Sequence, residues 1–140
     1  MARRISVAVL FAFALFLLGG PSLVAEAGPP RKPDLSGEWT CEGWNMGSNF
    51  KKKADYEIGV VVEAKGKDTY VVRWKLAGGR ENVGVGIYDP RTEAFAAGYN
   101  VGRSPGVAIY EISEDGKVMT CRGTFLGKIG HVAQERWTRD

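Results

Sequence analysis

From Gly37 to the C-terminus, short segments of alternating apolar and polar residues are separated by turn signals about every ten residues. The breaks fall at 65–68, 77–80, 89–92, 100–105, 114–117 and 127–130, where Gly, Pro, Asn, Asp and charged residues gather. No segment of this region has helical periodicity. The pattern is typical of an antiparallel barrel or sandwich, and it predicts an architecture rather than an activity.

The clearest strand places Tyr70, Val72, Trp74 and Leu76 on one face and polar or smaller residues on the other. Eight such segments are expected, near 38–43, 56–63, 70–76, 82–88, 94–99, 107–112, 118–125 and 131–138. Short turns between eight strands predict an all-β fold over 37–140, a single antiparallel up-and-down barrel whose closure removes exposed edges. Glycines inside 82–88 and 94–99 indicate either close approach of neighbouring strands or a cavity.

The N-terminus has the features of an export signal. Arg3 and Arg4 precede an uncharged apolar run, Ile5–Leu18, and Ala25 and Ala27 form an A-x-A cleavage pattern. The alternative is a membrane anchor, but the run is shorter than the roughly 20 residues that a spanning helix needs. We expect a signal peptide over 1–27, a flexible leader over 28–36, a periplasmic or extracellular location, and no stable membrane insertion after cleavage.

Charge argues against nucleic acid as a partner. Residues 1–27 carry two Arg and one Glu, so 17 basic and 15 acidic residues remain after cleavage. A nucleic-acid binder normally has a larger basic excess gathered on one face.

Cys41 and Cys121 are the only cysteines and lie 80 positions apart. In an exported domain two cysteines most often form a disulfide, which would stabilise the fold by roughly 3–5 kcal/mol; the alternative is two buried thiols. In a sequential barrel, however, the first strand neighbours the second and the eighth, not the seventh. A disulfide therefore requires a crossing near a barrel end or a different strand order.

The residues give little indication of catalysis, and we expect no catalytic residues, metal or cofactor. His131 is the only histidine, and the serines lie at turns or strand ends without a recognisable base. Two cysteines and one histidine are too few for a structural zinc site, which uses four ligands. Several glutamates, Glu135 among them, are expected mainly on the surface.

Binding is better supported, because the chain has many large aromatic rings for a small barrel. An eight-stranded barrel either fills itself with side chains or holds one small ligand. The segment 43–55 is the longest connection; it carries aromatic residues and ends near Lys51-Lys52-Lys53. The candidate ligand-binding residues are Trp44, Met46, Phe50, Tyr70, Trp74, Tyr99 and Tyr110.

Gly37-Glu38-Trp39, together with Arg136 and Trp137, resembles the lipocalin and avidin group of barrels. This resemblance implies that Trp39 closes one barrel end and that Arg136 or Arg139 stacks on it.

The segments 37–45, 68–74, 84–87 and 106–112 are similar to a family of small exported bacterial proteins often labelled fibronectin-binding. Met46 stands where that family has Pro, and Cys121 where a non-cysteine is expected. The resemblance implies an exported β-barrel and a matrix-protein partner.

We therefore expect a non-enzymatic binding module that holds a small apolar or amphipathic ligand in the barrel. The alternative is a module whose surface loops contact an extracellular matrix or envelope protein. A carrier should contain a mostly apolar cavity of roughly 300 Å³ or more near Trp44 or Phe50. A protein binder should have a filled interior and an exposed apolar patch.

Overall fold

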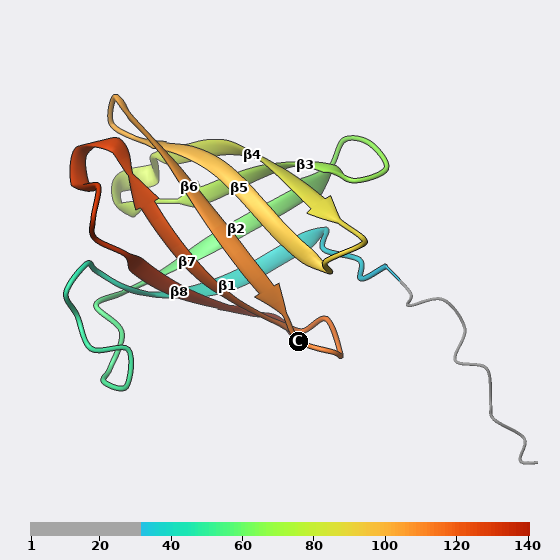
Figure 1. Cartoon of the computed structure of the whole chain (residues 1–140), viewed down its shortest axis with the longest axis horizontal. Helices are drawn as coiled ribbons and strands as arrows, with labels where there is room; N and C mark the ends of the chain where they lie inside the picture. The colour runs from blue at the N-terminus through green and yellow to red at the C-terminus, as the bar shows by residue number, and fades with distance from the viewer. Residues whose placement is uncertain (1–31) are drawn as a thin grey trace, which may run out of the picture. The chain divides into compact units, whose positions relative to one another are not determined.

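Each strand of the barrel pairs antiparallel with its neighbours in the sequence, and the ring closes on itself (Figure 1). The computed structural model describes residues 32–140, so the expected signal peptide (1–27) and the leader residues 28–31 lie outside the described residues. Pairing of the first and last strands, from Thr40↔Thr138 to Trp44↔Gln134, closes the barrel. The predicted all-β, eight-stranded up-and-down barrel is confirmed. Its strands are β1 (Gly37–Trp44), β2 (Tyr56–Ala64), β3 (Thr69–Lys75), β4 (Glu81–Asp89), β5 (Ala94–Val101), β6 (Ser104–Ile112), β7 (Val118–Phe125) and β8 (Ala133–Thr138).

Helical structure within residues 32–140 is limited to two short 3-10 turns, η1 (Ala77–Gly79) after β3 and η2 (Leu126–Lys128) after β7. None of the described helices has the length and apolar character needed to span a membrane.

The turn expected at 100–105 is shorter in the structure. Strands β5 and β6 stay paired through Asn100↔Pro105 and Val101↔Ser104, which leaves only Gly102 and Arg103 in the turn. Gly102 has a φ of 62°, a conformation that glycine adopts without steric cost. Pairing of β6 with β7 begins only at Gly106, so Pro105 lies beyond the part of β6 that pairs with β7. This is why a proline is tolerated in the strand.

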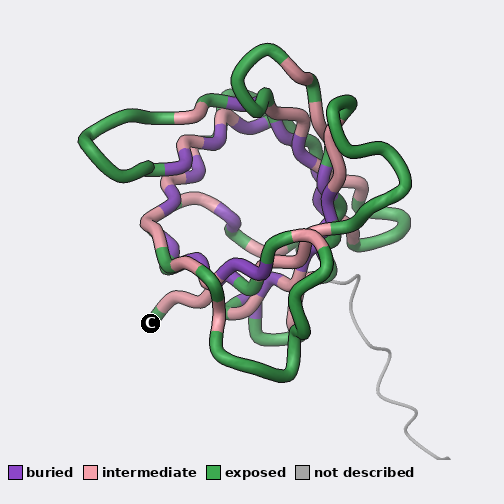
Figure 2. Tube along the Cα trace, turned by 90° about the vertical axis from the view of Figure 1, so that its left-hand side faces the viewer, coloured by how far each residue is buried: buried purple, intermediate pink, exposed green. Residues whose placement is uncertain are grey.

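Side chains alternate between the interior and the outside along every strand, and buried residues follow the inner circumference of the ring (Figure 2). One half of the interior is filled. Phe95 packs edge-on against Tyr70, with ring centres 5.5 Å apart, and against Tyr110 at 5.4 Å. Gly86 makes room for this packing, because a Cβ there would lie 2.3 Å from the Phe95 ring. The interior glycines of β4 therefore permit close approach of their neighbours.

The filled half ends in a closed base. Leu35 is fully buried there, and its carbonyl accepts a 3.1 Å hydrogen bond from Trp39 Nε1. The guanidinium of Arg139 lies 4.4 Å from the centre of the Trp39 ring and donates hydrogen bonds to the carbonyls of Ser36 and Gly116. The last residues of the expected leader are thus packed against the barrel.

Arg139, rather than Arg136, stacks on Trp39. The physical reason is the strand alternation: Trp137 points inward, so its neighbour Arg136 points outward. On the outer surface Arg136 forms an ion pair with Glu42 at 2.6 Å and lies 5.9 Å from the Trp44 ring.

The two cysteines are free thiols, so the predicted disulfide is wrong. Cys41 lies opposite Trp137 on β8, and Cys121 lies opposite Glu135 on the other side of the same strand. Two strand spacings, about 10 Å, separate their backbones. A disulfide tolerates a Cα separation of at most about 7 Å. The strand order holds, and β8 keeps the thiols apart.

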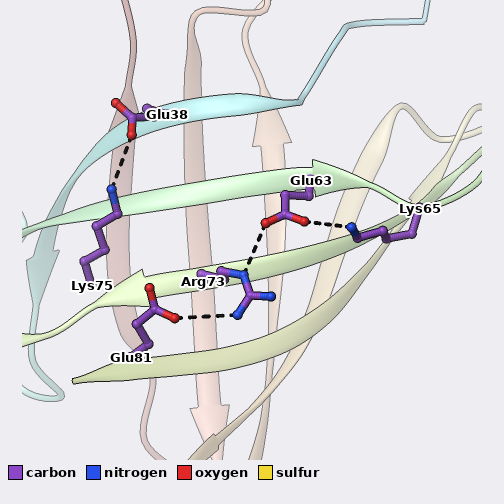
Figure 3. A network of polar contacts seen from close by, with 6 residues as sticks. All are labelled: Glu38, Glu63, Lys65, Arg73, Lys75 and Glu81. Carbon is purple, nitrogen blue, oxygen red and sulfur yellow. Dashed lines mark hydrogen bonds and ion pairs between the residues drawn. The ribbon is translucent and has the colours of Figure 1, made fainter. Parts of the chain in front are cut away.

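The outer surface differs around the ring. Across β1–β4 it carries ion pairs, with Arg73 between Glu63 (3.2 Å) and Glu81 (3.5 Å), and Lys75 on Glu38 (3.3 Å) (Figure 3). Across β4–β6 it is apolar, with exposed Val83, Val85, Ile87, Val107 and Ile109. Small residues of β5 lie between the two apolar rows, since Ala96 is opposite both Ile87 and Ile109.

Candidate ligand-binding cavity

The other half of the barrel contains a cavity of about 780 Å³. It opens among the β1–β2, β3–β4 and β7–β8 connections, at the end opposite the Trp39–Arg139 base. Aromatic and aliphatic side chains supply most of its wall, including Ile58, Trp74, Tyr99, Tyr110 and Phe125. Its volume lies within the range of small-molecule sites in proteins.

The space arises from a row of small residues that lie side by side in the sheet. Ala97 on β5 is opposite Ala108 on β6, which is opposite Gly123 on β7, which is opposite Ala133 on β8. Four strands thus present almost no side chain to the interior at one level. The next level toward the base carries Phe95, Tyr110, Cys121 and Glu135 in register. Of these, Tyr110, Cys121 and Glu135 form the floor of the cavity.

Glu135 is the acidic residue of this floor. Its Oε1 accepts a 2.8 Å hydrogen bond from the Tyr56 hydroxyl, and its Oε2 accepts a 2.8 Å hydrogen bond from Trp137 Nε1. The Cys121 thiol lies 3.9 Å from Oε2. Both oxygens act as acceptors, as an ionised carboxylate does.

Gly43 makes the contact between Tyr56 and Glu135 possible. It lies between them in the sheet, opposite Tyr56 on one side and Glu135 on the other. The Tyr56 ring crosses the space above it, and a Cβ on Gly43 would lie 1.9 Å from that ring. A side chain at position 43 would therefore separate the hydroxyl from the carboxylate.

The acidic groups around Glu135 keep their protons. Burial, and next the charge of Glu135, raise the pKa of Tyr56 well above its ordinary value. The same two causes raise the pKa of Tyr99 to about 12 and that of the Cys121 thiol well above its ordinary value. Burial is also the main reason why the pKa of Tyr110 lies well above its ordinary value. The floor thus holds one carboxylate among neutral hydroxyls and thiols.

Four of the seven predicted ligand-binding residues line the cavity: Met46, Trp74, Tyr99 and Tyr110. Tyr70 belongs to the filled half, where it contacts Phe95. Trp44 and Phe50 pack on each other with ring centres 4.6 Å apart. Trp44 is buried, and its Nε1 donates a 2.9 Å hydrogen bond to the carbonyl of Lys52.

Sequence reasoning missed Tyr56, Cys121 and Glu135 as cavity residues. The period-two alternation of β8 could have identified Glu135 as an interior residue, since it shares a face with the fully buried Trp137. Arg80, Lys128 and His131 line the mouth and are exposed. No group of three or more His, Cys, Asp or Glu side chains within residues 32–140 is placed to hold a metal ion.

Comparison with known protein families, curated proteins and solved structures finds no match for this chain. The class is therefore defined by fold and site: a closed, eight-stranded antiparallel barrel with a cavity open at one end.

Proposed function

We propose that this protein is an exported, non-enzymatic binding module that holds one small apolar or amphipathic ligand inside the barrel. The observation that carries the proposal is the cavity of about 780 Å³, which lies above the lower limit expected of a carrier and has a mostly apolar wall. Its opening lies beside Met46, in the connection that the sequence pointed to. Stacking of Arg139 on Trp39 supports the resemblance to lipocalin-like barrels.

A binding role fits the chemistry of the interior better than catalysis does. Thiols whose pKa is raised by burial are poor nucleophiles, because the thiolate is the reactive form. His131 is exposed on the β7–β8 connection, at the mouth of the cavity. No nucleic acid and no cofactor is part of the proposal.

The test begins with native mass spectrometry of protein purified from its own source. A bound small molecule supports the carrier. The fluorescent probe N-phenyl-1-naphthylamine then reports cavity binding in the isolated protein. We expect Ala133→Phe, which points into the cavity, to abolish probe binding. Ala96→Phe, on the outer face of β5, should leave it intact. Equal binding by both variants would place the probe outside the barrel and refute the proposal.

A second candidate function has its own observation. The exposed apolar rows on β4 and β6 form a surface of the kind that protein partners cover, since Val85 is 69% exposed and Ile109 57% exposed. An extracellular protein, as the fibronectin-binding resemblance implies, would contact this face rather than the loops. Val85→Lys combined with Ile109→Lys should abolish immobilised-fibronectin binding and spare cavity binding. Unchanged fibronectin binding by this variant, or none by the wild type, would exclude that partner.

A further inference from the structure

Glu135 is the only carboxylate lining the cavity among the described residues, and no ion pair of the described chain reaches it. Its hydrogen-bond donors, the Tyr56 hydroxyl, Trp137 Nε1 and the Cys121 thiol, are neutral. Glu135 is half-buried, and a carboxylate that is partly removed from water gains most from an opposite charge beside it. The floor of the cavity therefore carries a negative charge without a cationic partner from residues 32–140.

Aromatic side chains line the same cavity as this carboxylate. Tyr110 lies with its ring centre 4.6 Å from that of Trp137, and Trp74 lies 5.7 Å from Tyr99. Trp74, Tyr99 and Tyr110 lie in the wall of the cavity whose floor contains Glu135. Electron-rich ring faces attract organic cations, and the attraction grows when water is excluded. The carboxylate and the aromatic rings thus both favour a cationic ligand group.

The mouth has the opposite charge. Arg80 and Lys128 are exposed there and lie in water, where charges are screened over about 8–10 Å. A cation held at the mouth would meet like charge, whereas a cation at the floor would meet Glu135. A cationic group therefore has its most favourable electrostatic interaction at the inner end of the cavity.

We propose that the cavity selects a small amine with an apolar or aromatic body, whose protonated nitrogen donates a hydrogen bond to Glu135. This inference rests on the proposed function. An ammonium group carries up to three donors, and a carboxylate has about four acceptor positions. Tyr56, Trp137 and Cys121 occupy three of these positions on Glu135, so one is left for the ligand. The apolar body of the ligand would lie beside the row of small residues from Ala97 to Ala133.

The test uses three naphthalene compounds of similar shape at pH 7: 1-naphthylmethylamine (cationic), 1-naphthalenemethanol (neutral) and 1-naphthoic acid (anionic). Isothermal titration calorimetry measures each affinity for the full protein. A charge-assisted hydrogen bond predicts that the amine binds roughly tenfold or more tightly than the alcohol, with the acid weakest. Glu135→Gln should remove most of the preference for the amine. Glu111→Gln, the same change on the outer face of β6, should retain it.

The outcomes separate this inference from the proposed function. Equal affinity for amine and alcohol, or tighter binding of the acid, would overturn the amine inference while cavity binding stands. An unchanged preference in Glu135→Gln would overturn it as well. Failure of all three compounds and of N-phenyl-1-naphthylamine to bind would overturn both proposals. If Glu135→Gln does not fold, the order of the three wild-type affinities decides.

Discussion

The guanidinium of Arg139 lies face-on to the indole of Trp39, 4.4 Å from the ring centre, and binds the carbonyls of Asp34, Ser36 and Gly116. Arg139, which directly follows β8, thereby connects the chain end to the segment before β1 and to the β6–β7 turn. The base of the barrel depends on this arrangement.

Arg139→Ala should destabilise the protein by about 2–4 kcal/mol, because it removes charge-assisted hydrogen bonds and a cation–π contact. Arg136→Ala is the matched control. It breaks a surface ion pair with Glu42, and we expect a loss of about 1 kcal/mol or less. Urea unfolding measures both. Equal losses would show that Arg139 does not hold the base together.

The cysteines should titrate as two free thiols per chain in denaturant without reductant, and reductant should not change the melting temperature. In the native protein their reaction at neutral pH should be slow, because burial raises both pKa values and lowers the thiolate fraction. Cys121 lines the cavity and Cys41 does not. Methyl methanethiosulfonate should therefore modify Cys121 first, as peptide mass spectrometry can show. A chain with no titratable thiols and a mass lower by two hydrogens would contradict the structure.

Gly43→Ala should destabilise the barrel by about 1–3 kcal/mol, since the new methyl group would overlap the Tyr56 ring. It should also break the hydrogen bond between Tyr56 and Glu135. Gly98→Ala is the control, because a Cβ there meets its nearest neighbour at 3.9 Å, an ordinary contact. Urea unfolding should distinguish the two variants. Similar stability of both would mean that the close approach of Tyr56 is not essential.

Stability should fall at alkaline pH. In the folded state the pKa of Tyr99 is about 12, against an ordinary value of 10.0, and the pKa of Tyr56 is also raised. Groups whose folded pKa is raised stabilise the protein below their unfolded pKa, and that contribution is lost as pH rises through the folded value. The buried thiols, with an ordinary value of 9.0, extend the effect downward, so the loss should begin near pH 9.

Urea midpoints at pH 8, 10 and 11 test this prediction, and tyrosine absorbance near 295 nm should rise together with unfolding. Tyr99→Phe should weaken the decline. A constant midpoint from pH 8 to 11 would contradict the assignment of Tyr56, Tyr99 and Tyr110 to the interior.

The fold was predictable because turn residues and period-two alternation are local properties. The cavity was harder to predict from the sequence. The cavity depends on Ala97, Ala108, Gly123 and Ala133 coming into one row, which requires the register of four strands. The disulfide prediction failed for a related reason: sequence distance says nothing of the strand between Cys41 and Cys121. Trp44 resembled a loop aromatic until the structure showed its hydrogen bond to Lys52.

Within residues 32–140 the barrel is closed at its base by Trp39 and Arg139 and its cavity opens at the other end, which has a kinetic consequence. Whatever occupies the cavity must leave by the path through which it entered, so both directions cross the same barrier. Substitutions in the 47–55 part of the β1–β2 connection, which does not line the cavity, change the association and dissociation rates by the same factor if they raise or lower this barrier. They therefore alter how long a ligand stays without altering how tightly it binds.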